Sequence, residues 1–401
     1  MRLRTMEAYW LIKNGLLYTY PSIQNQEIFT QIVVVGGGIT GALISHQLVA
    51  AGYEVTLIDK RDIGMGSTSA TTALLQYEVD VPFIKLQKMI GHNKAEIAYR
   101  EGIIAIQQLH DLIINEKIDC GFEFKKSLYI AHNEKSTNWL TKEYDARQRI
   151  GIDVDWLDEN TISAHFGIHA AGGILSKHAA SVDAYRLTHA LIHNNAEKGM
   201  QVFDQAEIER MVFGKEGVIF TFKEGGKLSA TKAVFCNGFE ALFMFSEKIA
   251  DIYTTYASIS EQNMNVSLDT LNDTIVWDTA QPYFYMRTTD DKRLIIGGED
   301  SRGVDGINQQ RKERKGKKLT QKVSKLIPDI NFIEDFSWAG AFGSTKDGLP
   351  YIGVHPKYDH SFFVLGFGGN GITFSIQGMD MVIDWLKRKN NKLSDCYHFG
   401  R

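Results

Sequence analysis

Residues 32–43 read IVVVGGGITGAL and decide the fold of the chain. The β-branched run Ile32–Val35 predicts a strand that is buried on both of its faces. The run stops at Gly36, and an apolar helical pattern follows it. Gly36, Gly38 and Gly41 have the spacing of a turn that binds a dinucleotide. In such a turn, the first glycine permits the tight bend, the second admits a pyrophosphate to the backbone N–H groups, and the third lets the helix pack against the strand.

A second predicted strand, 54–58, ends at Asp59, where a carboxylate would bind the ribose of an adenosine. The alternative for Asp59 is a surface carboxylate of an ordinary βαβ unit. The segment 64–75 that follows is dense in small and hydroxyl side chains. We expect it to donate hydrogen bonds to a second phosphate and to let a flat ring pass close by. The alternative is a loop that caps the next helix.

Composition sets broad limits on the class of protein. A chain of 401 residues with 44% hydrophobic and 23% charged residues predicts about two domains or one large α/β body. The formal charge of −4 gives no reason to expect nucleic acid or an acidic membrane as a partner. No stretch is apolar and long enough to cross a bilayer. Three widely separated cysteines without metal or redox spacing predict reduced thiols, no metal site and a cytoplasmic location; they are Cys120, Cys236 and Cys396.

The rest of the chain predicts helices, a hairpin and a second glycine turn. Residues 83–150 are expected to be mostly helical around a strand at 125–131, and Asp183 is expected to cap a helix that reaches Lys198. A strand at 283–287 and its return at 294–298 predict a hairpin. The basic run 311–318 is interpreted as a solvated helix face. Residues 362–387 repeat the order of strand, glycine turn and helix.

Taken together, these motifs resemble the flavin-dependent amine and amino-acid oxidoreductases of the D-amino-acid oxidase superfamily, of the glycine oxidase, sarcosine oxidase and gamma-glutamylputrescine oxidase types. The resemblance extends from about residue 32 to residue 386, and its pieces are 33–41, 66–75, 293–298, 338–340, 345–353 and 366–373. It implies an α/β fold: a Rossmann-like FAD-binding domain with a central parallel sheet, and an interleaved α+β substrate domain with a mixed or antiparallel sheet. The expected arrangement is an N-terminal arm (1–28), a discontinuous FAD-binding domain (29–85, 160–245 and 335–401) and a substrate domain (86–159 and 246–334).

The resemblance also implies which residues hold FAD. The first glycine turn would bind the pyrophosphate, Asp59 and Lys60 would lie at the ribose, and the backbone of Ile208 would meet the adenine. The hydroxyl-rich loop would line the phosphates and the flavin, and amides of the last glycine turn would stabilise negative charge on the reduced flavin. The candidate cofactor-binding residues are Gly36, Gly38, Ile39, Thr40, Gly41, Asp59, Lys60, Gly66, Ser67, Thr68, Thr72, Ala73, Leu74, Ile208, Gly238, Gly340, Gly368, Gly369, Asn370, Gly371, Ile372 and Thr373.

The sequence departs from the glycine oxidase type at the substrate. An arginine that binds the substrate carboxylate in that type is replaced by Phe342, and a second arginine by Gly369. Losing a bidentate guanidinium removes about 2–5 kcal/mol of anchoring for a small amino acid. We therefore expect an amine or N-substituted substrate without that carboxylate, or a carboxylate held elsewhere. Arg287 could substitute, on a strand face with Tyr283 and Tyr285. The alternatives are a surface or hairpin arginine and two tyrosines that pack in the core.

A histidine that carries covalent flavin in some relatives is replaced by Ala70, and the family's flavin-linking cysteine is also absent. The resemblance therefore implies dissociable FAD, hydride transfer from the carbon beside the substrate nitrogen to flavin N5, and oxygen or another electron acceptor. No catalytic base is assigned. Two alternatives stay open at this point. One is a nicotinamide-dependent flavin reductase, which a single dinucleotide fingerprint disfavours, and the other is a flavin-binding subunit without amine turnover.

Overall fold

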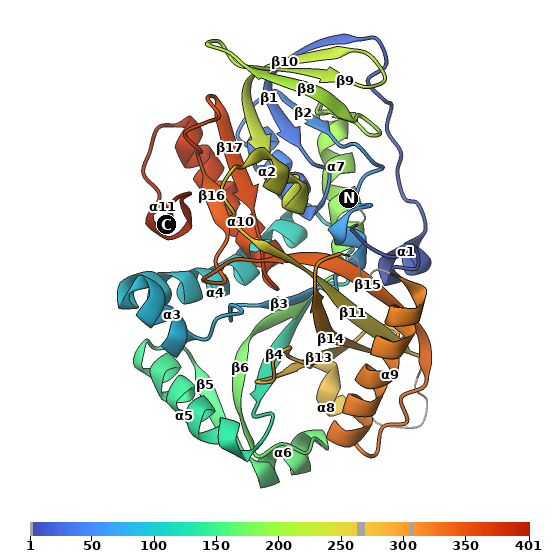
Figure 1. Ribbon diagram of the computed structural model, residues 1–401, viewed down its shortest axis with the longest axis vertical. Coiled ribbons are helices and arrows are strands. Elements are labelled where there is room, and N and C mark those ends of the chain that lie inside the picture. Colours follow the sequence, from blue (N-terminus) through green and yellow to red (C-terminus); the bar gives the residue numbers. More distant parts are fainter. Residues whose placement is uncertain (1–2, 263–268, 305–307) are drawn as a thin grey trace.

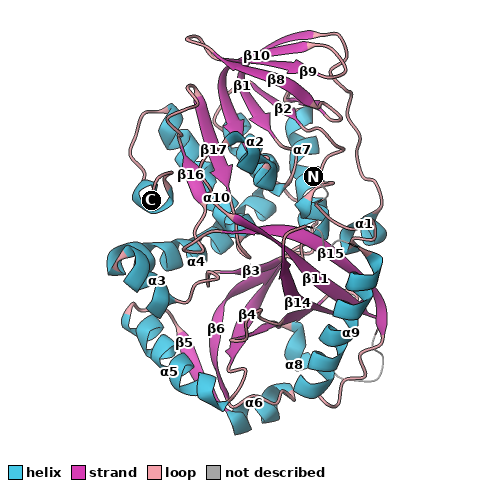
Figure 2. Cartoon of the chain, viewed as in Figure 1, coloured by secondary structure: helices cyan, strands magenta, loops and turns pink. Residues whose placement is uncertain are grey.

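A computed structural model describes residues 3–262, 269–304 and 308–401 (Figure 1). Two large sheets organise the chain, one near each end of the long axis of the molecule (Figure 2). The other positions belong to the predicted arm (1–2) and to the predicted substrate domain (263–268 and 305–307), so the predictions for those positions lie outside the described residues.

The eight-stranded sheet contains the strand that the opening motif predicts. β1 runs parallel to β10 and β2, β10 runs parallel to β17, and β2 runs parallel to β7. β16 is antiparallel to β17 at one edge, and the antiparallel strands β8 and β9 continue from β10. The bounds are β1 (Glu27–Val35), β2 (Val55–Ile58), β7 (Gln201–Phe203), β8 (Ile208–Phe213), β9 (Val218–Phe222), β10 (Lys227–Phe235), β16 (Tyr351–Gly353) and β17 (Ser361–Leu365).

The continuous apolar run in β1 is explained by burial on both sides of this sheet. Ile32 and Val34 pack in a core that includes residues of the long helices. Val33 and Val35 lie in a second core with Phe220 of β9 and other aromatic side chains. The helices that contribute to the first core include α2 (Ile39–Ala50), α4 (His92–Asn115), α7 (Ala184–Glu197) and α10 (Gly371–Leu386). A strand with both faces covered needs an apolar residue at every position, which is the pattern read from the sequence.

The nine-stranded sheet is mixed and has the order β15-β11-β14-β13-β12-β4-β6-β3, with β5 paired to β6. Helix α9 packs across β11, β14 and β15. The strands are β3 (Leu74–Gln76), β4 (Glu123–Ile130), β5 (Val154–Asp158), β6 (Gly172–Ser181), β11 (Asp251–Ser260), β12 (Thr274–Asp278), β13 (Tyr285–Thr288), β14 (Leu294–Arg302) and β15 (Glu334–Ser344). The remaining helices are α3 (Phe83–Ile90), α5 (Glu134–Arg149), α6 (Glu159–Phe166), α8 (Asp269–Asn272), α9 (Gln309–Leu326) and α11 (Ser394–Tyr397), with 3-10 turns η1 (Ser67–Ala70) and η2 (Gly238–Met244).

The predicted α/β class, with a parallel-rich sheet and a second mixed sheet, is confirmed. The expected hairpin is present as β13 paired with β14, and Asp183 caps α7 by accepting hydrogen bonds from the N–H groups of Tyr185 and Arg186. Three strands from ranges expected for the FAD-binding domain, β3, β6 and β15, belong to the nine-stranded sheet instead. The chain therefore crosses between the sheets more often than the predicted ranges imply, and the domain boundaries stay a prediction.

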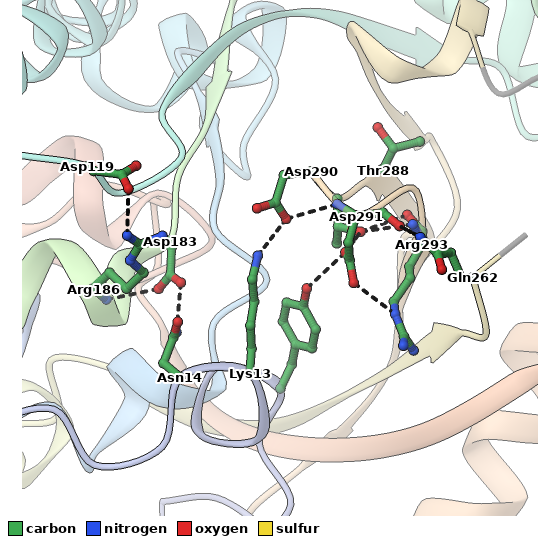
Figure 3. Close-up of polar contacts among 12 residues, drawn as sticks. Lys13, Asn14, Asp119, Asp183, Arg186, Gln262, Thr288, Asp290, Asp291 and Arg293 are labelled. Atoms are coloured by element: carbon green, nitrogen blue, oxygen red, sulfur yellow. Dashed lines mark hydrogen bonds and ion pairs between the residues drawn. The ribbon is translucent and has the colours of Figure 1, made fainter.

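The N-terminal arm is built into the molecule through α1 (Tyr9–Asn14). Lys13 Nζ lies 2.5 Å from Asp290 in the β13–β14 turn, and Asn14 donates to Asp183 at the start of α7 (Figure 3). Tyr9 and Trp10 are buried, so this part of the arm is packed against the rest of the molecule. It thereby ties the hairpin of the nine-stranded sheet to a helix that covers the eight-stranded sheet. Among the described residues, no helix is long and apolar enough to cross a membrane.

Candidate cofactor and substrate site

The carboxyl ends of the parallel strands open into a cavity of about 750 Å³. Gly36 follows β1, Asp59 follows β2, Cys236 follows β10 and Gly366 follows β17, and all four residues line this cavity. Crevices at the carboxyl ends of parallel strands are where open α/β sheets bind ligands. The far side of the cavity is formed by residues of the nine-stranded sheet, so the site lies between the two sheets.

The first glycine turn has no room for side chains. Gly36 has φ +114°, and a Cβ placed there would lie 2.6 Å from the carbonyl oxygen of Cys236. A Cβ on Gly41 would lie 1.8 Å from the carbonyl oxygen of Gly36. The helix therefore packs closely against the strand at Gly41, as the glycine spacing predicts. The N–H of Ile39, at the start of α2, donates to Thr68 Oγ1 at 3.0 Å. The hydroxyl-rich loop thus meets the start of the preceding helix.

Asp59 is held rigidly beside this turn. Its Oδ2 accepts the N–H of Gly37 at 2.7 Å and its Oδ1 accepts the N–H of Arg61 at 2.8 Å. Burial raises the pKa of Asp59, and these two backbone hydrogen bonds oppose that rise. Lys60 and Arg61 form ion pairs with Glu240 of η2, at 2.5 and 2.8 Å. The Asp59 carboxylate and the first glycine turn are therefore fixed relative to each other in the lining of the cavity.

Three consecutive carbonyl groups of the hydroxyl-rich loop are each held by a different part of the chain. Trp338 Nε1 of β15 donates to the carbonyl of residue 70 at 2.8 Å, Trp10 Nε1 of α1 to that of residue 71 at 2.7 Å, and Arg287 Nε of β13 to that of residue 72 at 2.7 Å. The next residue, Ala73, has φ +51°, a backbone conformation that residues other than glycine rarely adopt. The loop conformation is therefore imposed by tertiary contacts.

The second glycine turn lies against the same cavity. Asn370, at the start of α10, donates through Nδ2 to the carbonyl groups of Gln76 and Glu78 at 2.9 and 2.8 Å. Thr40 Oγ1 of α2 and Ser375 Oγ of α10 are 2.8 Å apart. The N-termini of α2 and α10 line the cavity, so the partial positive charge of each helix end is directed into the cavity.

On the opposite side, a β-bulge sets the direction of Asp300. In the pairing of β11 with β14, Thr254 pairs with Ser301 and Tyr256 with Gly298, so Glu299 and Asp300 together oppose one residue. Glu299 has φ +58°. Bulges redirect side chains near active sites, and this one places Asp300 in the cavity lining. Burial raises the pKa of Asp300 to about 6, while a hydrogen bond from Thr255 opposes the rise.

Helix α9 holds this bulge from behind. Lys315 Nζ donates to the carbonyl oxygen of Glu299 at 2.7 Å and lies 3.2 Å from its Oε2, and Lys322 Nζ lies 3.0 Å from Oε1. Lys312 is also buried and pairs with Glu7 at 3.2 Å. The interpretation of 311–318 as a solvated face is therefore wrong for Lys312 and Lys315, because both side chains are covered and serve as ion-pair partners.

A second carboxylate, Asp80, lies where the family resemblance implies an arginine. Asp80 Oδ2 accepts the N–H of Gly369 at 2.9 Å, and the hydroxyl of Tyr283 hydrogen-bonds to the same carboxylate. A Cβ on Gly369 would lie 2.8 Å from Asp80 Oδ1 and 3.1 Å from Tyr283 Oη. Asp80 and Tyr283 thus occupy the space that a side chain at position 369 would need.

Most of the predicted site residues meet at this cavity. Of the candidates named from the sequence, all line it except Gly41, Ala73 and Arg287. The guanidinium of Arg287 donates to the carbonyl oxygens of Thr72 and Thr288, and Arg287 lines a different, much smaller cavity together with Trp10. Tyr283, Tyr285 and Phe342 do line the main cavity. The residues that sequence reasoning missed there include Asp80, Thr255, Trp277, Asp300 and Trp338.

The signal for Asp300 was present in part. The sequence Gly297-Gly298 before Glu299 and Asp300 marks an irregular strand end, since glycines inside a strand indicate a bulge or a close approach. Indeed, the ring of Tyr285 covers Gly297, where a Cβ would lie 2.3 Å from Tyr285 Oη. The direction of Asp300 depended on which residue of β11 it opposes, and no local pattern gives that pairing.

This constellation fits a flavin dinucleotide. The N-terminus of α2 suits the pyrophosphate, the N-terminus of α10 suits negative charge on a flavin, and the Asp59 carboxylate suits a ribose. The packed glycine turns allow close approach of a large planar ligand. The volume lies within the 300–1,000 Å³ range typical of ligand sites. Cys120, Cys236 and Cys396 are all free and buried, and of these Cys236 lines the cavity. Burial raises the pKa of Cys236, so its thiol is a poor nucleophile.

Comparison with known proteins places the chain in a class. Residues 31–382 match the family described as DAO, FAD dependent oxidoreductase, and the chain belongs to this family. It is thus an FAD-dependent oxidoreductase of the amino-acid oxidase type.

The individual relatives are distant. The chain is similar to glycine oxidase of Geobacillus kaustophilus, with 25% identity over 89% of this chain and 93% of that protein. It is also similar to gamma-glutamylputrescine oxidoreductase of Escherichia coli, with 22% identity over 87% of this chain and 82% of that protein. The crystal structure of the Geobacillus kaustophilus glycine oxidase superposes with a TM-score of 0.78 and 22% identity, covering 93% of this chain and 99% of that one. This structural likeness shows the fold, and it leaves the substrate undetermined.

Proposed function

We propose that this protein oxidises a C–N bond of an amine or N-substituted amino compound, using FAD held without a covalent bond. The observation that carries the proposal is the pairing of two glycine turns on one cavity, whose lining has Phe342 and Gly369 at the two positions where the resemblance implies arginines. Gly36 and Gly38 belong to one turn and Gly369 and Asn370 to the other. Bound FAD would accept a hydride from the carbon beside the substrate nitrogen.

The protein's own residues would bind and orient. Gly36, Gly38, Ile39 and Thr40 would face the pyrophosphate, Asp59 and Lys60 the adenosine ribose, and Ile208 the adenine, all of them at the eight-stranded sheet. Residues 66–74 would pass along the flavin, with their conformation fixed by Trp10, Trp338 and Arg287. The amides at the start of α10 would stabilise negative charge at the cofactor. Gly41 and Ala73 would act by shaping the turns.

Two observations support a dissociable cofactor. Ala70 lies where some relatives have a flavin-linking histidine, and its Cβ would touch a Cβ on Gly340 at 3.1 Å, so this corner is closely packed. Cys236, the cavity-lining cysteine among the described residues, lies beside the first glycine turn rather than on the nine-stranded sheet. Acid precipitation of the purified protein should therefore leave the yellow colour in the supernatant, and colour retained in the pellet would refute the proposal.

The function is tested by anaerobic mixing of the yellow protein with amines, amino acids and NADH in separate samples. We expect loss of the flavin's visible absorbance with an amine and none with NADH. Rapid loss with NADH would instead indicate the nicotinamide-dependent reductase. Stable absorbance with every amine would indicate a flavin-binding subunit without amine turnover. Reoxidation with air and with artificial acceptors then separates an oxidase from a dehydrogenase.

A further inference from the structure

The nine-stranded sheet contributes a single charged side chain to the described lining of the cavity, and that side chain is Asp300. The basic side chains of the described lining come from the eight-stranded sheet and its loops; they are Lys60, Arg61, Arg210 and Lys357. The side of the cavity that faces away from the predicted nucleotide is therefore negative, and no basic group from the nine-stranded sheet offsets it in the part of the chain described.

Asp300 has an unused acceptor. Its Oδ1 is shielded from water and has no hydrogen-bond partner among the described residues. A buried acceptor without a donor costs free energy, so it calls for a reason such as a ligand that supplies the donor. The hydrogen bond from Thr255 leaves this second oxygen unmatched. A ligand with N–H donors and a positive charge would satisfy both the geometry and the charge.

The direction of Asp300 is specifically built. Glu299 adopts a left-handed conformation that costs on the order of 1–3 kcal/mol for a residue with a side chain. Lys315 and Lys322 hold Glu299 in place through its carbonyl and carboxylate oxygens. These lysines bind behind the bulge and point their charge at Glu299, which leaves Asp300 available on the cavity side.

Aromatic rings line the same cavity as this carboxylate. Tyr283, Tyr285 and Trp277 all line the cavity, with ring centroids 5.8 Å apart for the two tyrosines and 6.4 Å apart for Trp277 and Tyr283. Both tyrosines also lie against the strand residues that precede Asp300: the ring of Tyr285 covers Gly297, and the carbonyl oxygen of Tyr283 lies 2.4 Å from the Cβ position of Gly298. Aromatic faces attract ammonium groups, so rings and carboxylate together select a cation.

Resting on the proposed function, we propose that the substrate is an aliphatic amine that enters as a cation and carries no carboxylate beside its nitrogen. Asp300 receives the positive charge and is the residue that sets this specificity. The aromatic side chains at positions 277, 283 and 285 enclose the alkyl part and the charge. An α-amino acid would bring its carboxylate toward Asp300 and is selected against.

The test measures binding without turnover. tert-Butylammonium has no hydrogen on the carbon that bears nitrogen, so it cannot be oxidised there, and pivalate is an anion of similar shape. Calorimetric titration of the FAD-loaded protein should show binding of tert-butylammonium. The affinity for pivalate should be lower than the affinity for tert-butylammonium by about tenfold or more. D300N should weaken tert-butylammonium binding by about tenfold or more, and D300E should restore part of it.

The control variant is D155N, which removes the same charge from an exposed position on β5, outside the cavity. It should bind tert-butylammonium as the unaltered protein does. Equal binding by D300N, or tighter binding of pivalate than of the cation, would overturn the proposal. Flavin content and melting temperature show whether D300N keeps its fold, and D300S supplies the same comparison if the asparagine variant loses flavin.

Failure of this inference is distinguishable from failure of the proposed function. If tert-butylammonium binds through Asp300 and no amine bleaches the flavin, cation recognition stands and amine oxidation falls. If α-amino acids bleach the flavin faster than the amines that lack their carboxylate, such as glycine against methylamine or sarcosine against dimethylamine, the oxidation stands and the cationic specificity falls.

Discussion

In the proposed function, the two sides of the cavity recognise their ligands by different means. On the eight-stranded sheet, recognition is carried by backbone: glycine turns, helix N-termini and one carboxylate, Asp59, fixed by two N–H groups. On the nine-stranded sheet it is carried by side chains, namely Asp300 and the neighbouring aromatic rings. The groups at the eight-stranded sheet would bind a cofactor that is common to a whole family. The side chains at the nine-stranded sheet can change without disturbing that cofactor, and in this way one fold can act on different substrates.

The largest expected effect comes from disrupting the first glycine turn, on the eight-stranded side of the cavity. In G36A the new Cβ would lie 2.6 Å from the carbonyl oxygen of Cys236, in a residue with φ +114°, so the turn must move. We expect FAD affinity to fall by about 100-fold or more, since strain and displaced amides act together. The measurement is flavin retained after gel filtration, with circular dichroism to confirm the fold.

The matched control for that substitution is G52A. Gly52 has φ +83°, similarly unfavourable for alanine, but nothing lies within 4 Å of its Cβ position. It should lose some stability and keep its flavin. If both variants retain flavin equally, close approach at Gly36 is not what binds the cofactor.

The next largest expected effect comes from changing the charge of the cavity lining on the nine-stranded side. Phe342 lines the cavity and stacks on Tyr253 with centroids 5.7 Å apart, at the position where the resemblance implies an arginine. F342R combined with D300N should reverse the charge of this side. We expect the preference for tert-butylammonium over pivalate to change by about 10- to 100-fold in favour of the anion, as expected for charge pairs in partly desolvated sites. Calorimetry on the FAD-loaded variant measures it, and an unchanged preference would show that charge on this side does not select the ligand.

A pH titration sharpens the same comparison. Burial raises the pKa of Asp300 to about 6, with Asp80 adding to the rise and Lys315 opposing it. Asp300 is therefore ionised above about pH 6 and neutral below it. Binding of tert-butylammonium, which stays protonated throughout, should weaken by about tenfold per pH unit below that point. In D300N the same titration should be much flatter between pH 5 and 7, and a profile identical to that of the unaltered protein would assign the titration to another group.

The sequence predicted the two sides unequally, and the reason is physical. Gly36, Asp59 and Asn370 were found because strand, turn and helix follow one another locally, and parallel strands bring their carboxyl ends together automatically. Asp300 was missed because its direction depends on a bulge between strands about 45 residues apart, and on lysines from a third element. Arg287 was expected beside the tyrosines, yet it lies outside the cavity because it holds the carbonyl of Thr72.

The smallest expected effect concerns the contact that joins the two sides. Trp10 is buried, donates to the carbonyl of Thr71 at 2.7 Å and lies under the Arg287 guanidinium, 5.6 Å from ring centroid to Cζ. W10F keeps an aromatic ring but removes the donor, leaving a buried carbonyl unmatched at a cost of about 1–3 kcal/mol. We expect melting temperature and FAD affinity to fall together, the affinity by about five- to tenfold, because this loop is the one proposed to pass along the flavin. W385F removes the same indole group from a helix face outside the cavity, where it packs on Phe362, and it should change stability without changing FAD affinity. Equal loss of FAD affinity in both variants would mean that Trp10 acts through general stability and that the N-terminal arm does not position the loop.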